Sequence, residues 1–285
     1  MRILLLFFSI TFSQVFSTYD YVGSRATAMS GSITSGPGGI WSIFHNPAQL
    51  AEVSEFEIVS GHCQIYNLSF LPYSNFGLVY NGWAINFEKL STKINSINLS
   101  SESAFGISKG FTVYKDRQSI IQAGLRFNLY QYDLGDSAGP EGDGTLGINL
   151  GQGTLKGLDI GFQGVLNKKY YIAYYLENIN SPTVGTDFGS DLPKSFSIGI
   201  SYMPYEDLLT SFELNQLFSH SESEMRFGIE YYLNESFVIR NGIQINPNRY
   251  STGFSYVMSS IELSYGLITH HVLPITHQIS ISMKL

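Results

Sequence analysis

The sequence predicts an all-β protein: a transmembrane antiparallel β-barrel of about 14 strands (about 12 to 16) with a small N-terminal helical plug in its lumen. Three observations support this fold class. Most of the chain alternates apolar and polar residues in short runs separated by turn residues. Tyr, Phe and Gly number 19, 20 and 28, whereas only 14% of the residues are charged, which is typical of a wall that faces lipid. No apolar run approaches the roughly 18 to 20 residues that a transmembrane helix needs.

Residues 1–17 have the pattern of a secretory signal peptide. Arg2 supplies the positive start, an apolar run covers residues 3–12, and small or neutral residues near Val15 and Ser17 offer a cleavage site. We therefore expect an exported chain that resides in the bacterial outer membrane.

Residues 18–54 form the predicted plug, because they depart from the strand-and-turn pattern of the rest. The small residues at 23–31 suit a short helix, the glycine-rich run at 36–39 must end it, and residues 41–44 suit a second apolar turn that ends at Pro47. Irregular backbone at membrane depth must lie inside the wall, since lipid cannot satisfy its hydrogen bonds. The plug residues of interest are Arg25, Ala26, Trp41, Phe44, Asn46, Pro47 and Ala48.

Residues 55–285 form the predicted barrel. Leu125 and Phe127 lie on one face of a strand, and Arg126 and Asn128 lie on the other. The same division recurs in residues 225–231, 237–245 and 279–285. One face is therefore expected to meet lipid, and the mostly polar face to line the lumen.

Short and long connections alternate along this region, as expected when one end of a barrel carries turns and the other carries loops. The short ones are predicted at residues 81–82, 115–118, 167–169, 204–207, 234–235 and 259–260, and the long ones at 92–102, 134–156, 179–194, 219–223, 246–249 and 269–275. The count reaches about 14 strands if residues 56–70 are one strand bent near Gly61 and residues 144–150 belong to a loop.

Seven ionisable residues are placed in the lumen by the alternation. Charges there are costly unless they are paired or hydrated. Acids and bases are comparable in number, so we expect an ion-pair network that holds wall to plug, with a substrate path as the alternative. These residues are Glu88, Arg126, Glu213, Arg226, Glu230, Arg240 and Glu262.

Three other patterns invite a chemical interpretation. Residues 106–110 match the G-x-S-x-G nucleophile motif, but a strand follows where the motif requires an elbow and a helix, so the glycines more simply leave room for the plug. His270 and His271 are adjacent and would point to opposite faces of a strand, which disfavours a shared metal with His277. The acidic residues 133–144 lack the ladder of an EF-hand, and we interpret them as a solvated loop, with a bound ion as the alternative.

Composition excludes some classes of protein. The net charge of −7, without a basic face, argues against a nucleic-acid partner. Cys63 is the only cysteine, so no intramolecular disulfide forms. No pattern indicates a catalytic site, a cofactor or a metal, and we expect a non-enzymatic protein whose main partner is outer-membrane lipid.

The order of several motifs resembles the FadL-like outer-membrane barrels, and in particular their PorV/PorQ-type branch, which is associated with type IX secretion. The motifs are Arg25-Ala26 with the small residues after it, Asn46-Pro47-Ala48 leading to Leu50, Leu158 to Gly161, Leu192-Pro193 before residues 197–202, and the ending at 276–282. The resemblance spans most of the chain and implies that residues 18–54 are a hatch.

The resemblance implies two functions. The first is a secretion-associated or structural barrel whose partners are secretion-system components. The alternative is a FadL-like transporter of long-chain fatty acids or other hydrophobic compounds, which needs an apolar tunnel past Trp41, Ile43 and Phe44. A lipid hydrolase would need an adjacent Ser and His at the membrane-facing surface, and no pattern places them together.

Overall fold

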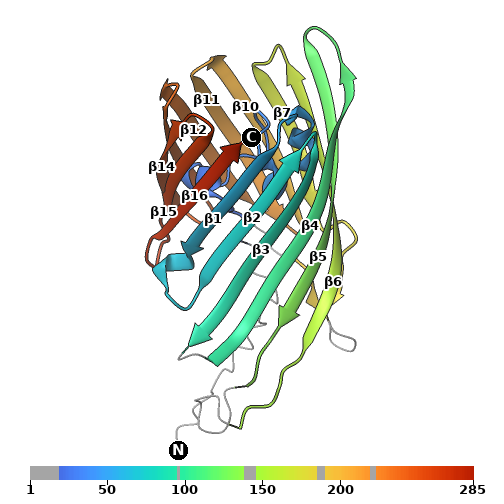
Figure 1. The fold of residues 1–285 in the computed structure, drawn as a ribbon, viewed down its shortest axis with the longest axis vertical. Coiled ribbons are helices and arrows are strands. Elements are labelled where there is room, and N and C mark those ends of the chain that lie inside the picture. The colour runs from blue at the N-terminus through green and yellow to red at the C-terminus, as the bar shows by residue number, and fades with distance from the viewer. Residues whose placement is uncertain (1–18, 95–96, 138–145, 185–189, 219–222) are drawn as a thin grey trace, which may run out of the picture.

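The computed structural model describes residues 19–94, 97–137, 146–184, 190–218 and 223–285 (Figure 1). The predicted signal peptide and part of the acidic stretch lie outside these ranges. The helices are α1 (Ser24–Ala28), α2 (Ser42–His45), η1 (Pro47–Glu52) and η2 (Ile65–Asn67). The strands are β1 (Glu57–Gln64), β2 (Pro72–Tyr80), β3 (Trp83–Ile94), β4 (Ile97–Lys115), β5 (Ser119–Asp133), β6 (Gln152–Leu166), β7 (Tyr170–Glu177), β8 (Thr183–Val184), β9 (Ser190–Asp191), β10 (Ser195–Tyr205), β11 (Leu208–Leu217), β12 (Glu224–Asn234), β13 (Phe237–Ile245), β14 (Arg249–Met258), β15 (Ile261–Ile268) and β16 (Thr276–Lys284).

Fourteen of the described strands close into one antiparallel barrel. β1 pairs along its whole length with β2 on one side and with β16 on the other, so the first and last strands seal the ring. β8 and β9 form a separate two-stranded sheet within the connection from β7 to β10. The predicted fold class and strand number are confirmed. Among the described residues, no helix is long and apolar enough to cross a membrane.

The wall has an apolar outer face and a polar inner face, as the alternation predicts. In β5, Leu125 is 45% exposed whereas its neighbour Arg126 is 4% exposed. The outward row on the adjoining strands consists of large apolar residues such as Phe105, Ile107 and Phe162. An apolar surface that encircles a barrel in this way needs a non-aqueous surrounding.

The wall is taller on one side than on the other (Figure 1). β4 has 19 residues and β5 and β6 have 15 each, whereas β7 and β15 have 8 each. β4 continues past the start of β3 at the end with the short turns, because Trp83 pairs with Lys109. β6 extends past β7 at the opposite end, because Ile160 pairs with Leu176. The long strands therefore place extra wall around one part of the lumen.

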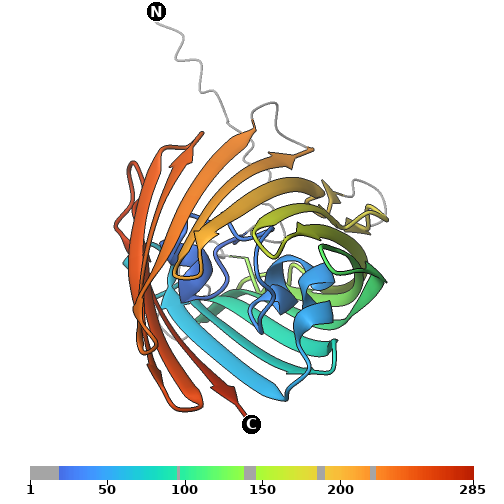
Figure 2. The same cartoon turned by 90° about the horizontal axis from the view of Figure 1, so that it is seen from above.

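We call residues 19–54 the plug; they lie inside the ring of strands in the view along the barrel (Figure 2). α1 contacts the wall at β13 to β16, whereas η1 contacts β4, β5 and β6. Ile43 and Leu50, both fully buried, join Val59, Val79 and other apolar residues in the main core. The core of this protein therefore lies between plug and wall.

Two expected connections are wrong. Residues 56–70 are not one bent strand: the ladder runs regularly through Gly61 and ends at Gln64, and the chain turns at η2, where Tyr66 and Asn67 adopt positive φ. Residues 92–102 are not a long loop, since Ser91 pairs with Ser101 in continuous strands. Their Ser, Thr and Lys side chains indicated a loop, but a strand that extends beyond the apolar band needs no apolar face.

Three further connections also differ from the prediction. Only three residues separate β13 from β14, so residues 246–249 form a short turn. The region from 134 to 156 includes the beginning of β6, and the region from 179 to 194 contains β8 and β9. The predicted number of strands is nevertheless right, because these differences concern where strands and connections end and remove no strand from the barrel wall.

Candidate functional site

A cavity of about 140 Å³ lies between the plug and the wall. The plug contributes Tyr19, Val22, Phe44 and His45 to its lining. The wall contributes side chains that include Tyr73, Glu88, Tyr130, Tyr175, Glu177 and Arg226. Leu192, which is buried and follows β9, lines the same space. The cavity is thus formed by segments from across the chain, and it combines aromatic rings with charged groups.

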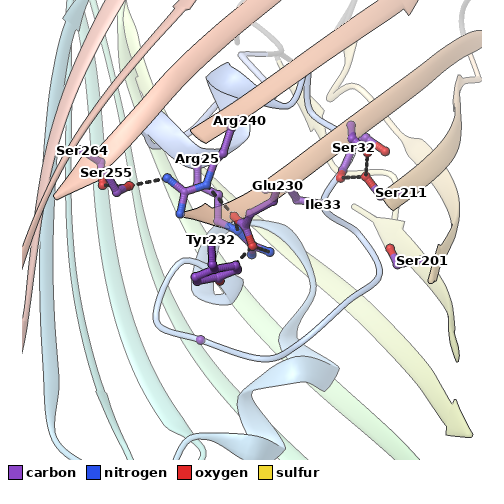
Figure 3. Close-up of polar contacts among 12 residues, drawn as sticks. Arg25, Ser32, Ile33, Ser201, Ser211, Glu230, Tyr232, Arg240, Ser255 and Ser264 are labelled. Atoms are coloured by element: carbon purple, nitrogen blue, oxygen red, sulfur yellow. Dashed lines mark hydrogen bonds and ion pairs between the residues drawn. The ribbon is translucent and has the colours of Figure 1, made fainter. Parts of the chain in front are cut away.

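The first of three charged clusters joins α1 to β12 and β13 (Figure 3). Arg25 donates from Nε to Glu230 Oε2 at 2.9 Å, and Arg240 Nε donates to the same oxygen at 2.5 Å. Arg240 also donates to Ser255 and lies 3.5 Å from a carboxylate oxygen of Glu262. Glu230 therefore holds two guanidinium groups, one from the plug and one from the wall.

The second cluster is centred on Arg226 in β12. Its Nη2 lies 2.6 Å from Asp20 and 2.5 Å from Glu224, and its Nη1 lies 3.4 Å from Glu213. Glu213 also accepts hydrogen bonds from the backbone of the plug at Ile33 (3.1 Å) and Thr34 (2.9 Å). Three acids surround one base, so this cluster is more negative than neutral.

The third cluster lies on the taller side of the wall. Arg126 Nε lies 2.7 Å from Asp159 Oδ2, and its Nη1 donates to the carbonyl of Ile43 in the plug at 2.7 Å. Arg126 also donates to the hydroxyl of Tyr175. This guanidinium uses all three of its nitrogens: it fixes α2, it pairs with Asp159 and it binds Tyr175.

Glu88 belongs to none of these clusters. Its carboxylate accepts from the hydroxyl of Tyr73 at 2.6 Å and from Asn86 Nδ2 at 3.2 Å. The seven residues expected to form one lumenal network therefore all lie on the inner side of the wall, but they divide into three clusters and one isolated carboxylate.

The plug residues named from the sequence have different surroundings. Asn46 accepts from Ala48 N at 3.0 Å and donates to the carbonyl of Thr34 at 2.9 Å, so it caps η1 and ties it to the preceding loop. Pro47 begins η1. Ala26 and Ala48 are buried, and Trp41 stacks near Phe44 with ring centroids 6.0 Å apart. A Cβ at Gly23 would overlap the ring of Trp41, which explains glycine at that position.

His45 and Tyr21 occupy the same buried region of the plug. The imidazole of His45 contacts the carbonyl of Val22 through Nε2 at 2.8 Å. Burial lowers the pKa of His45 to about 3, and the guanidinium groups nearby act in the same direction. His45 is therefore neutral at pH 7. Burial also raises the pKa of Tyr21 to about 12.

For Arg25, neighbouring groups together outweigh burial in setting the pKa. Burial alone would lower it, but the carboxylate of Glu230 raises it above its usual value. The pair therefore remains ionised inside the barrel.

The other sequence patterns contribute no chemistry. The G-x-S-x-G residues lie within β4, where Ser108 faces inward and is buried, without an elbow or a helix after it. His270 and His271 follow β15 and are not in a strand, so the expectation that they point to opposite faces is wrong: their rings lie tilted against each other with centroids 4.3 Å apart. His277 bonds the hydroxyl of Tyr265 on the outer face. Among the described residues, no group of three or more His, Cys, Asp or Glu could hold a metal ion.

Several residues of the cavity were not singled out from the sequence, nor was Asp159, which pairs with Arg126 beside it. The cavity residues are Asp20, His45, Glu177 and the tyrosines at 19, 73, 130 and 175. The inward position of Asp159 could have been predicted from the sequence, because it lies between the apolar residues Leu158 and Ile160 in an alternating strand. Glu177 and Tyr19 lie at the ends of their segments, where alternation carries no information about which side chains meet.

The fold is similar to that of solved outer-membrane channels. The toluene transporter TbuX of Ralstonia pickettii superimposes with a TM-score of 0.64 at 13% identity, covering 94% of this chain and 99% of that one. The toluene transporter TodX of Pseudomonas putida gives 0.61 at 13% identity, with 95% and 99% covered. A FadL homologue of Pseudomonas aeruginosa gives 0.56 at 9% identity, with 92% and 97% covered. At these identities the likeness establishes the fold alone. Neither a protein-family model nor a curated protein matches the sequence.

Proposed function

We propose that this chain is a FadL-like barrel of the bacterial outer membrane, without enzymatic activity. The apolar outer face supports the membrane setting, and so do the aromatic side chains that flank the short turns. Tyr80 and Trp83 border the turn between β2 and β3, and Tyr170, Tyr205 and Tyr256 border others; all five are exposed. Aromatic rings of this kind favour the boundary between lipid and water. Residues 1–17 would direct export, and residues 18–54 would act as the hatch.

The proposed activity is the uptake of small, largely hydrophobic compounds through the space between plug and wall. The observation that carries it is the cavity of about 140 Å³ with its aromatic lining. This volume is close to the roughly 150 Å³ of an engineered apolar cavity that binds benzene, so it suits a single ring. Two channels with the same fold are described as transporters of toluene, which supports this size of compound.

Filling the cavity tests this proposal. Ala104 lines the cavity from β4, and Ala104→Phe would occupy part of its volume. Ile107→Phe, on the outer face of the same strand, is the matched control. We expect cells that carry the protein to take up toluene faster than cells that lack it, and we expect Ala104→Phe alone to abolish the difference. Equal uptake with and without the protein would reject the transport proposal.

The secretion-associated or structural role of a PorV/PorQ-type barrel is the second candidate. The observation in its favour is the close fit of the plug, since Ile43 and Leu50 are fully buried. In that case the protein would act through its loops, and secretion-system components would be its partners. Affinity purification from the native outer membrane would recover such components, and Ala104→Phe would leave this association unchanged.

A further inference from the structure

Acidic side chains outnumber basic ones around the cavity, and this bears on what the cavity binds. The acids in its lining are Asp20, Glu88, Glu102, Glu177 and Glu213, and the bases are Lys89, Arg126 and Arg226. His45 adds no positive charge to the lining, because burial holds its pKa near 3.

The two buried bases are already engaged. Arg126 is paired with Asp159, and Arg226 is shared among three carboxylates. Glu88 and Glu177, by contrast, have no Lys, Arg or His within salt-bridge distance among the described residues. Glu177 accepts from Ser195 Oγ at 2.9 Å, and Glu88 accepts from neutral groups on Tyr73 and Asn86. Carboxylates enclosed in this way are costly unless a cation or a hydrogen-bond donor faces them.

Aromatic groups near Glu88 favour the same kind of partner. Rings of Tyr19, Tyr73 and Phe44 line the cavity nearby. Aromatic faces attract an ammonium group, and they also bury the apolar body of a ligand. The cavity therefore combines the carboxyl groups of Glu88 and Glu177 with aromatic rings. The guanidinium groups of Arg126 and Arg226 already have carboxylate partners.

We infer that the cavity selects a small aromatic amine in its protonated form, with the ammonium group directed at Glu88 and Glu177 and the ring among the tyrosines. The inference rests on the proposed uptake function, because it assigns a ligand class to the same cavity. It differs from that function by requiring a positive charge on the compound.

A series of ring compounds that differ in one substituent tests the inference. Toluene, benzyl alcohol, benzylamine and benzoate have similar size and carry an apolar, a neutral polar, a cationic and an anionic group. Binding is measured by saturation-transfer NMR on the intact barrel in nanodiscs, with empty nanodiscs subtracted. We expect benzylamine to bind most tightly and benzoate least.

Variants assign the effect to the carboxylates. Glu177→Gln and Glu88→Gln keep the shape of each side chain and remove its charge, and Glu206→Gln on the exposed β10–β11 turn is the control. We expect each cavity variant to weaken benzylamine binding by about tenfold or more, the usual size of a lost hydrogen bond to a charged group, and to weaken it more than toluene binding.

The outcomes separate this inference from the proposed function. Toluene binding at least as tight as benzylamine binding would overturn the charge selection and leave the transport of hydrophobic compounds standing. Benzylamine binding that survives in both cavity variants would also overturn it. If none of the four compounds binds, the proposed function fails together with the inference.

Discussion

The two halves of the plug are held by different chemistry. The first half, residues 19–35, makes polar contacts with β10 to β16: Ser24 bonds Ser280 at 2.8 Å, Arg25 pairs with Glu230, and Ser35 bonds Ser201 at 2.7 Å. The second half, residues 40–54, fits by shape. A Cβ at Gly110, Gly124 or Gly161 would overlap η1 or the residue that caps it. Wall glycines admit the first half as well, because a Cβ at Gly242 or Gly266 would overlap its backbone. The halves differ in their ion pairs: among the described residues, those between plug and wall come from Asp20 and Arg25 in the first half. The second half instead receives hydrogen bonds, such as the one from Arg126 to the carbonyl of Ile43.

This contrast predicts which changes release the plug and how strongly. The glycine-rich residues 36–39 separate the halves, and a Cβ at Gly39 would meet nothing within 4 Å. The halves still contact each other, because Asn46 donates to the carbonyl of Thr34 and the ring of Trp41 packs against Gly23.

Removing both halves should have the largest effect. Deletion of residues 21–51 should leave an assembled barrel, because the fourteen-strand ladder closes without them. It should increase conductance in a planar bilayer, since the deleted segment fills the lumen. A normally assembled deletion variant with unchanged conductance would place the segment outside the barrel and remove the hatch assignment.

Breaking the charged half should come next. Glu230→Ala leaves the guanidinium groups of Arg25 and Arg240 without their shared carboxylate, and removing one partner of a buried pair costs about 3 to 5 kcal/mol. We expect frequent openings in single-channel recordings and faster proteolysis of the plug. Glu235→Ala, on the exposed turn after β12, should behave as the unmodified protein. Equal behaviour of the two variants would show that the ion pairs do not hold the plug.

Filling the glycine contact should have a smaller effect, confined to the second half. Gly124→Ala would place a methyl group against the backbone of Pro47 and Ala48, and such overpacking costs about 1 to 3 kcal/mol. Gly164→Ala on β6 is matched in chemistry, but its added Cβ would meet no atom closer than 3.9 Å. Protease accessibility of residues 40–54 should rise only in the first variant. A rise in both would mean that glycine acts through strand flexibility and not through contact.

The sequence predicted the wall better than the site, for physical reasons. Alternation decides which face a strand residue occupies, so the inward positions of Arg126, Arg226 and Glu230 followed from their neighbours alone. It does not decide which inward residues meet. Arg25 reaches Glu230 across 205 positions because the ring closes and the plug turns within it. The division of seven charges into three clusters and an isolated Glu88 required the register of the strands.

The smallest expected effect concerns His45, which lies at the end of α2 and contacts the first half through the carbonyl of Val22. Its pKa is about 3 in the docked plug, against about 6.5 for a solvated imidazole. Docking is therefore fully stable above about pH 6.5 and weakens as the pH falls toward 3, because the released plug takes up a proton that the docked plug excludes. At about pH 5.5 the loss is about 1.4 kcal/mol, one unit below the solvated pKa. The probability of channel opening should accordingly rise between about pH 7.5 and about pH 5.5, and His45→Gln should remove this increment because glutamine does not titrate. An identical pH profile in the variant would assign the response to the carboxylates of the cavity, and His45 would then be a contact of the two halves without control over their release.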